Sequence, residues 1–266
     1  MKVSLIQMNS QGDKAANLAS AKTLIEQAVA TDGPDMVVLP EYFTHLESNI
    51  PARQASAETL PEGETYVMLS GLAARHGIYV HGGSLVERDG DDIYNTTVAF
   101  GRKGEELARY RKMHRYDVIT PDGVQHMESA SVGRGDEIVT YDIEGNVRVG
   151  CSICYDVRFP ELYQVLFGKG AKIIMVPAAF MLLTGKDHWE VLLKARAIET
   201  TSYVVAAAQF GSFTTGNCYG HSLVVDPWGH VIAKARDEVG FVTATLDFDY
   251  LDSVRAKIPL ASHKLI

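Results

Sequence analysis

The most constraining feature of the sequence is a run of six apolar residues from Tyr203 to Ala208, which reads Tyr-Val-Val-Ala-Ala-Ala. A strand with one face in water alternates apolar and polar residues, whereas a strand covered on both faces is apolar throughout. Residues 36–39 form another apolar run, residues 3–7 and 147–151 also read as buried strands, and segments with helical spacing of apolar residues separate several strands. Such alternation predicts a layered α/β fold in which helices cover sheets.

Two of the apolar strands continue in the same way. Residues 36–43 read Met-Val-Val-Leu-Pro-Glu-Tyr-Phe and residues 173–180 read Ile-Ile-Met-Val-Pro-Ala-Ala-Phe, so both end at Pro-x-x-Phe. An echo this short either arises by chance or marks two similar β-α halves joined across one core. The 266 residues, of which 46% are hydrophobic, are enough for a large core, and we expect one domain over residues 1–266.

Charge and cysteine content argue against several classes of protein. A formal net charge of -8 argues against a nucleic-acid partner, because binding phosphates needs clustered Lys and Arg. Three cysteines are too few for a disulfide framework, and the first residues lack the long apolar region of a signal peptide. The sequence contains no uninterrupted run of about 18 apolar residues, which is the length needed to span a membrane. We therefore expect a soluble protein of a reducing compartment, the cytoplasm.

A cysteine marks the end of the strand predicted at residues 147–151. Cys154 follows it, and a helical pattern opens at Phe159-Pro160-Glu161. A cysteine at such a junction is held rigidly at the end of a sheet, where neighbouring backbone N–H groups can lower the thiol pKa and stabilise an oxyanion. Cys154 is therefore the candidate nucleophile, although a structural cysteine would be the default for an arbitrary sequence.

The spacing of Cys151 and Cys154 also forms a C-x-x-C, which could be a redox pair or half of a metal site. A redox pair normally lies exposed at a helix N-terminus, whereas Cys151 falls inside the apolar strand. A zinc site would need two further ligands at plausible spacing, and only Cys218 and scattered histidines remain. We interpret Cys151 as a small core residue.

A cysteine hydrolase also needs a base for the thiol proton and a positive charge for the oxyanion. Histidine is the usual base, but none of the nine histidines lies in a setting that distinguishes it. A carboxylate can act instead if burial and a nearby cation tune it, since Glu and Cys otherwise differ by about 4 pKa units. Glu41, at the end of an apolar strand, and Lys112 could supply this arrangement.

Three short motifs stand in order along the chain, namely Leu39-Pro-Glu41, Tyr110-Arg-Lys112 and Cys154-Tyr-Asp-Val-Arg-Phe-Pro-Glu161. They resemble the hallmarks of the nitrilase superfamily of carbon-nitrogen hydrolases. The resemblance covers essentially the whole chain and is most similar to the Nit branch, which contains deaminated glutathione amidase and omega-amidase. It continues through His188-Trp-Glu190, Ala195-Arg-Ala-Ile-Glu199, residues 203–209, Tyr219-Gly-His-Ser222 and Asp226-Pro-Trp-Gly229.

The resemblance implies a fold, an assembly and a reaction. The fold would be an α-β-β-α sandwich, and the chain would form a homodimer or higher homo-oligomer through one helical face. The reaction would be hydrolysis of the carboxamide of a small acidic amide through a cysteine thioester, with no metal and no organic cofactor. Deaminated glutathione is the expected substrate. The alternatives are an omega-amidase acting on 2-oxoglutaramate or 2-oxosuccinamate, and another carbon-nitrogen hydrolase such as an N-carbamoyl amide hydrolase.

The resemblance also implies individual roles. Glu41 would be the general base and acid, Lys112 the cationic support and Cys154 the nucleophile, with the Tyr155 backbone N–H at the oxyanion. Glu128 matches a second glutamate that hydrogen-bonds the lysine, although a solvated loop carboxylate is the alternative.

Two further residues are candidates for substrate binding. Arg158 could clamp a substrate carboxylate or pair with Asp156 or Glu161 within the scaffold. Phe180 could line the pocket or belong to the core.

Two observations bear on function in other ways. The loop at residues 110–132 lacks periodicity, and long loops of this kind are often functional. Its part from Asp117 to Gln125 departs from the pattern expected for the superfamily, which leaves the substrate open. A catalytically silent binding module on the same scaffold is the main alternative from another class. The joint presence of Glu41, Lys112 and Cys154 argues against it.

Overall fold

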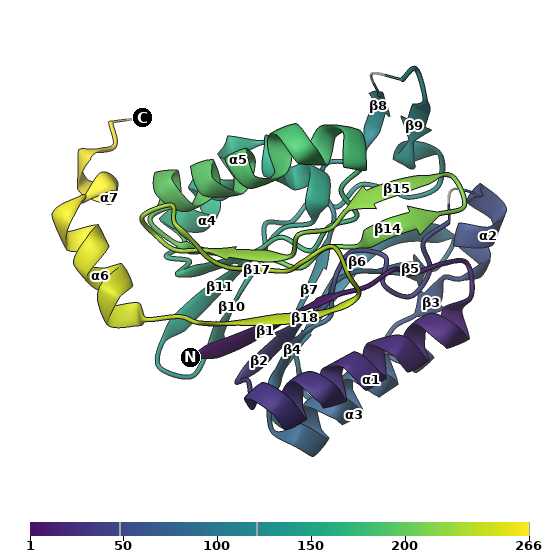
Figure 1. The fold of residues 1–266 in the computed structure, drawn as a ribbon, viewed down its shortest axis with the longest axis horizontal. Coiled ribbons are helices and arrows are strands. Elements are labelled where there is room, and N and C mark those ends of the chain that lie inside the picture. Colours follow the sequence, from purple (N-terminus) through teal and green to yellow (C-terminus); the bar gives the residue numbers. More distant parts are fainter. Residues whose placement is uncertain (48, 121, 266) are drawn as a thin grey trace.

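Two β-sheets pack against each other at the centre of the molecule, and helices cover their outer faces (Figure 1). The computed structural model describes residues 1–47, 49–120 and 122–265. The layers follow the order helix, sheet, sheet, helix, so the predicted α-β-β-α sandwich is confirmed.

The first sheet has eight strands. They are β1 (Lys2–Gln7), β2 (Met36–Val38), β3 (Glu58–Thr59), β4 (Tyr79–His81), β5 (Leu85–Asp89), β6 (Asp92–Phe100), β7 (Glu106–Arg111) and β18 (Gly240–Thr245). Their order is β18-β1-β2-β4-β6-β5-β3, and β7 pairs with β6. Neighbours β1, β2 and β4 run parallel. Helices α1 (Lys14–Asp32) and α3 (Glu64–His76) cover the outer face of this sheet (Figure 1).

The second sheet has six strands in the order β10-β11-β12-β13-β16-β17. They are β10 (Thr140–Ile143), β11 (Val147–Cys151), β12 (Ile173–Met175), β13 (Tyr203–Ala206), β16 (Leu223–Val225) and β17 (Val231–Lys234). Neighbours β11, β12 and β13 are parallel. Helices α4 (Pro160–Gly168) and α5 (Leu182–Thr200) cover the outer face of this sheet (Figure 1).

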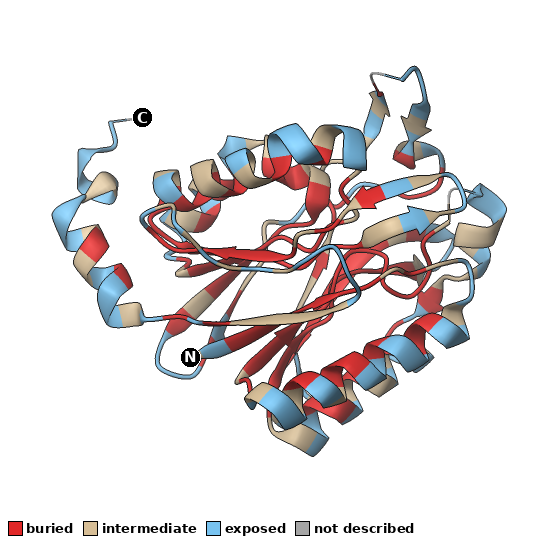
Figure 2. Cartoon of the chain, in the orientation of Figure 1, coloured by how far each residue is buried: buried red, intermediate tan, exposed pale blue. Residues whose placement is uncertain are grey.

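Strand periodicity divides the apolar side chains between the layers. In β2, Met36 and Val38 pack into the core shared with the second sheet, whereas Val37 packs into the core under α1 and α3. Figure 2 shows the consequence for α1, which turns a buried face toward the sheet and an exposed face toward solvent. The run 203–208 is buried throughout, as predicted for a strand covered on both faces.

The sequence echo corresponds to equivalent positions in the two sheets. Strand β2 is the middle strand of the parallel trio β1-β2-β4, and β12 is the middle strand of β11-β12-β13. Pro40 follows the first of these strands and Pro177 the second. The two similar sequence segments therefore follow equivalent central strands, one in each sheet, and both continue beside the candidate nucleophile.

The segment expected to lack regular structure is partly ordered into short elements. It contains the hairpin of β8 (Asp117–Ile119) and β9 (Gln125–Met127), and then the 3-10 helix η1 (Glu128–Ala130). The hairpin protrudes beside α5 (Figure 1). Strands of three residues are too short to give a periodic signal, which is why the sequence pattern did not predict them.

The remaining elements border the sandwich. They are α2 (Ile50–Ala55), the 3-10 helix η2 (Cys154–Arg158), the hairpin of β14 (Phe210–Phe213) and β15 (Gly216–Tyr219), α6 (Phe248–Lys257) and α7 (Leu260–His263). Among the described residues, no helix has both the length and the apolar character needed to cross a membrane.

Candidate active site

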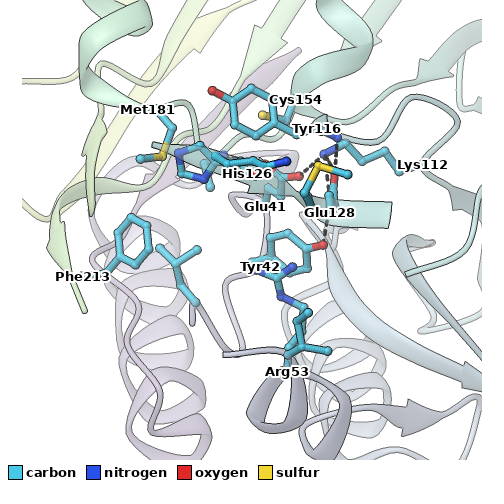
Figure 3. Close-up of a pocket in the computed structure, with 15 residues that line it drawn as sticks. Glu41, Tyr42, Arg53, Lys112, Tyr116, His126, Glu128, Cys154, Met181 and Phe213 are labelled. Atoms are coloured by element: carbon cyan, nitrogen blue, oxygen red, sulfur yellow. Dashed lines mark hydrogen bonds and ion pairs between the residues drawn. The ribbon is translucent and has the colours of Figure 1, made fainter. Parts of the chain in front are cut away.

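The candidate active site is a cavity of about 270 Å³ at the ends of strands from both sheets (Figure 3). Glu41 comes shortly after β2, Lys112 directly after β7, and Cys154 shortly after β11, while Glu128 opens η1. All four residues line the cavity. The structure therefore brings together the four side chains predicted to be catalytic, although they are far apart in the sequence.

Lys112 joins the two carboxylates. Its Nζ donates to Glu41 Oε1 at 2.8 Å and to Glu128 Oε2 at 2.9 Å, and all three side chains are buried. Burial favours the neutral amine, but the charges of Glu128 and Glu41 outweigh it and raise the pKa of Lys112 well above its ordinary value. The side chain is therefore an ammonium ion at neutral pH.

Glu128 is held as a carboxylate by several donors besides Lys112. The Tyr42 hydroxyl donates to Oε1 at 2.7 Å, Asn95 Nδ2 donates to Oε1 at 3.1 Å, and the Tyr116 N–H donates to Oε2 at 2.6 Å. Burial opposes ionisation, but the Lys112 charge and these hydrogen bonds outweigh it and lower the pKa of Glu128 to about 2. So weak a base is poorly suited to take a proton from a thiol, and Glu128 is suited to position Lys112.

Glu41 is the carboxylate that interacts with the nucleophile. It is near enough to the Cys154 thiol to raise the pKa of that thiol, while its Oε2 accepts from the Ala179 N–H at 2.8 Å and its Oε1 accepts from Asn95 Nδ2 at 2.9 Å. These bonds fix the carboxylate between Lys112 and the thiol. A proton could pass from sulfur to Glu41 without a large movement of either side chain.

Both turns that carry these groups contain a residue in the left-handed region. Cys154 has φ 45°, and Tyr42, next to Glu41, has φ 52°. For residues other than glycine this conformation costs on the order of 1–3 kcal/mol and persists only where the surroundings enforce it. The Cys154 N–H donates to Pro177 O at 2.9 Å, which ties the nucleophile's turn to the segment that follows β12. Such strain fits a residue held in place for function.

The expectation that backbone N–H groups lower the pKa of the Cys154 thiol is wrong. Burial and the negative charge of Glu41 raise the pKa of Cys154 well above its ordinary value, and the opposing Lys112 charge does not compensate. Cys154 is therefore a neutral thiol in the free protein at neutral pH. A base is needed at the moment of attack, and Glu41 is in place to act as one.

This protonation state predicts how alkylation of Cys154 depends on pH. Iodoacetamide should modify Cys154 slowly at pH 7, and the rate should still rise at pH 9, because a thiol with a raised pKa stays protonated above the ordinary value of about 8.5. Peptide mass spectrometry at a series of pH values measures the rate at Cys154 alone, and glutathione serves as the reference thiol. A plateau below pH 8 would contradict the assignment.

Two of the residues predicted to bind substrate adjoin the nucleophile. Tyr155 and Phe180 line a smaller cavity of about 20 Å³, and Cys154 lines both this cavity and the larger one. Arg158 lines neither cavity. Its guanidinium lies over the rings of Phe180 and Tyr155, at 5.1 and 5.8 Å, and its two terminal nitrogens lie 3.3 Å from His188 Nδ1.

Several residues of the site were not anticipated from the sequence. Tyr42 and Asn95 bind the carboxylates, and Tyr116 and His126 line the cavity. The position of Tyr42 next to Glu41 was an available signal. Asn95 gave none, because it lies within the ordinary strand sequence of β6 and reaches the site only through the pairing of β6 with β7.

Both cysteines of the C-x-x-C are buried. Cys151 is fully buried in β11, the described cysteines are free thiols, and burial raises the pKa of Cys151 to about 12. Over residues 1–47, 49–120 and 122–265, no group of three or more His, Cys, Asp and Glu side chains could hold a metal ion. Cys151 belongs to the core between the sheets.

Replacing Cys151 distinguishes a hydrolase from a dithiol enzyme. A Cys151→Ala variant should keep kcat within about threefold of wild type, because the thiol is fully buried in the core and removing it leaves only a small cavity. Ammonia release from an amide substrate measures this, with the melting temperature as a check on folding. Complete loss of activity in a folded variant would revive the dithiol interpretation.

Comparison with known proteins agrees with this geometry. The model of the carbon-nitrogen hydrolase family matches residues 2–256. The chain belongs to this family. It is 39% identical over 265 residues to a protein of Synechocystis named deaminated glutathione amidase, covering 98% of this chain and 96% of the relative. It is 38% identical over 266 residues to a human omega-amidase, covering 99% and 94% respectively.

A solved structure places this carbon-nitrogen hydrolase within the nitrilase superfamily. Saccharomyces cerevisiae Nit3, described as a member of branch 10 of that superfamily, superposes with a TM-score of 0.89 at 34% identity, covering 98% of this chain and 94% of the yeast chain. The resemblance to the superfamily seen in the motifs is confirmed over nearly the full length of the chain.

Proposed function

We propose that this carbon-nitrogen hydrolase cleaves the amide carbon-nitrogen bond of a small acidic amide, such as deaminated glutathione, through a thioester on Cys154. The observation that carries the proposal is the buried cluster in which Lys112 bridges Glu41 and Glu128 beside a protonated thiol. Each group needed for thioester chemistry is present there. The names of the relatives in Synechocystis and human support an amide substrate.

In the first half of the reaction, Cys154 Sγ attacks the amide carbon while Glu41 accepts the thiol proton. The oxyanion that forms is stabilised by the Lys112 ammonium and the Tyr155 backbone N–H. Glu41 then returns its proton to the nitrogen, the carbon-nitrogen bond breaks, and the amine leaves, which is cysteinylglycine for deaminated glutathione and ammonia for a primary amide. Because Lys112 is buried, its charge is little screened by solvent and stabilises the oxyanion more strongly than an exposed charge would.

In the second half, water hydrolyses the thioester. Glu41, now a carboxylate again, takes a proton from the attacking water and returns it to the departing sulfur. The acid product leaves, and Cys154 is restored as a thiol. Glu128 takes no proton in either half and instead holds Lys112 in place through the cycle.

A substrate panel tests the proposal. Hydrolysis should be fastest for deaminated glutathione, measured as release of cysteinylglycine, and slower for 2-oxoglutaramate, an N-carbamoyl amine and a simple nitrile, measured as release of ammonia. A Cys154→Ala variant should hydrolyse none of them. Preference for 2-oxoglutaramate would instead assign the chain as an omega-amidase. Hydrolysis of none of the panel would contradict the proposed substrate class.

We also propose that the protein is a cytoplasmic homodimer joined through its outer helical face. Three apolar side chains, Ile198 of α5, Trp228 of the β16–β17 turn and Ile258 at the end of α6, are 53%, 48% and 39% exposed and border one hollow. Light scattering with size-exclusion chromatography should give about twice the chain mass of 29.1 kDa. A fully active protein that has the mass of one chain in this measurement would contradict the dimer.

A further inference from the structure

The cavity carries a positive charge that the proposed chemistry does not use. Arg53 of α2 lines the same cavity as Glu41 and Cys154. Its Cζ lies 5.0 Å from the centre of the Tyr42 ring, and the Tyr42 hydroxyl binds Glu128. Figure 3 shows Arg53 on the side of Tyr42 that faces away from Cys154 and Lys112. The guanidinium therefore belongs to the end of the cavity opposite to the reacting groups.

The guanidinium is oriented but not saturated. Nη1 donates to Ser131 Oγ at 2.8 Å and Nη2 donates to Glu47 O at 2.9 Å, which uses two of the five N–H donors that an arginine has. Both partners are neutral oxygen atoms, and the ion pairs of the described residues do not include Arg53. Nε is buried and has no hydrogen-bond partner among these residues. Arg53 is thus a fixed cation with no ion-pair partner among the described residues.

The charge balance of the cavity makes this cation necessary for an anionic substrate. Glu41 and Glu128 contribute two negative charges and Lys112 contributes one positive charge, which leaves the reacting end net negative. His126 also lines the cavity, but burial lowers its pKa below the ordinary 6.5, so it is neutral at pH 7. Without Arg53, the site would repel a carboxylate. With it, the two ends of the cavity have opposite character.

We propose that Arg53 binds the carboxylate at the far end of a linear monoamide of a dicarboxylic acid, so that this contact selects acidic amides and positions the carboxamide at Cys154. The proposal deepens the proposed function and rests on it. A planar guanidinium matches a carboxylate with two parallel hydrogen bonds, which fixes direction as well as adding affinity. Arg158, the arginine first considered for this role, lines neither cavity.

The test compares two amides of equal chain length, glutaramate, which carries a far carboxylate, and pentanamide, which does not. Arg53→Met should lower kcat/KM for glutaramate by roughly 100-fold while changing pentanamide hydrolysis by less than about threefold, because only the charged substrate loses a partner. Arg53→Lys keeps the positive charge but not the planar pair of N–H donors. It should therefore lower kcat/KM for glutaramate by less than Arg53→Met does, and leave pentanamide hydrolysis unchanged. Ammonia release measures both substrates.

Arg88→Met is the matched control. Arg88 Nη2 donates to Gln54 O of α2, the helix that carries Arg53, but Arg88 does not line the cavity. It should leave the ratio between the two substrates unchanged. Equal losses on both substrates in folded Arg53→Met, or a selective loss in Arg158→Met instead, would overturn the role of Arg53 while leaving the proposed function intact. A wild-type protein that hydrolyses neither primary amides nor deaminated glutathione would overturn both.

Discussion

Replacing Cys154 with alanine is expected to lower kcat/KM for amide hydrolysis by at least about 10⁴-fold, because no thioester can form without the sulfur. The change should leave the fold intact, since Cys154 is buried and alanine is smaller and apolar. Ammonia release measures the loss, and the melting temperature should stay within several degrees of wild type.

Two comparisons sharpen this prediction. Cys151 is fully buried and lies three residues before Cys154. A Cys151→Ala variant should therefore retain activity. Cys154→Ser keeps a hydroxyl but is a far weaker nucleophile, so it should resemble Cys154→Ala. If a folded Cys154→Ala variant kept more than a few per cent of wild-type activity, Cys154 would not be the nucleophile.

Glu41→Gln is expected to produce two effects of opposite direction. Hydrolysis should fall by about 10³-fold or more, because the amide of glutamine cannot accept the thiol proton or activate water. At the same time the pKa of Cys154 should fall, because in the wild type Glu41 raises it more than Glu128 does, and Lys112 lowers it. Iodoacetamide should therefore modify Cys154 faster at pH 7 in the variant than in wild type.

This pair of measurements separates the loss of a base from the loss of the fold. An unfolded variant would also react faster with iodoacetamide, but it would expose Cys151 and Cys218, which are buried in the native protein. Glu128→Gln is the matched control. It removes one negative charge, as Glu41→Gln does, but Glu128 hydrogen-bonds Lys112, Tyr42 and Asn95. We therefore expect the rate of Cys154 alkylation to increase less than in Glu41→Gln. Slower alkylation of Cys154 in Glu41→Gln would contradict the base assignment.

The positions of Glu41 and Cys154 were predictable because each follows an apolar strand that the sequence marks clearly. Strand β2 is buried throughout and β11 is buried except at Arg148, so both are rich in apolar residues and their ends are easy to recognise. The architecture was predictable for the same reason. Long-range pairing was not, which is why Asn95 was missed. It reaches Glu41 and Glu128 because the Lys112 N–H donates to Asn95 O at 2.8 Å where β7 ends beside β6.

The electrostatics of the thiol could not be predicted from local sequence. The turn at Cys154 suggested backbone N–H groups as the dominant influence, but the pKa of Cys154 is set by burial and by Glu41, more than 100 residues away. Arg53 was missed because it lies on a short helix without a motif. Its importance appears only when the charges lining the cavity are considered together.

The central claim is that one thioester intermediate forms on the enzyme, and partitioning with hydroxylamine tests it most directly. Two substrates that share an acyl group but differ in the leaving amine, such as an amide and its N-methyl derivative, give the same thioester if Cys154 acts as described. Hydroxylamine competes with water for that thioester and yields a hydroxamate. We predict the same ratio of hydroxamate to acid from both substrates, and none of either product from Cys154→Ala. A ratio that depends on the leaving amine, or normal hydrolysis without any hydroxamate, would contradict the account.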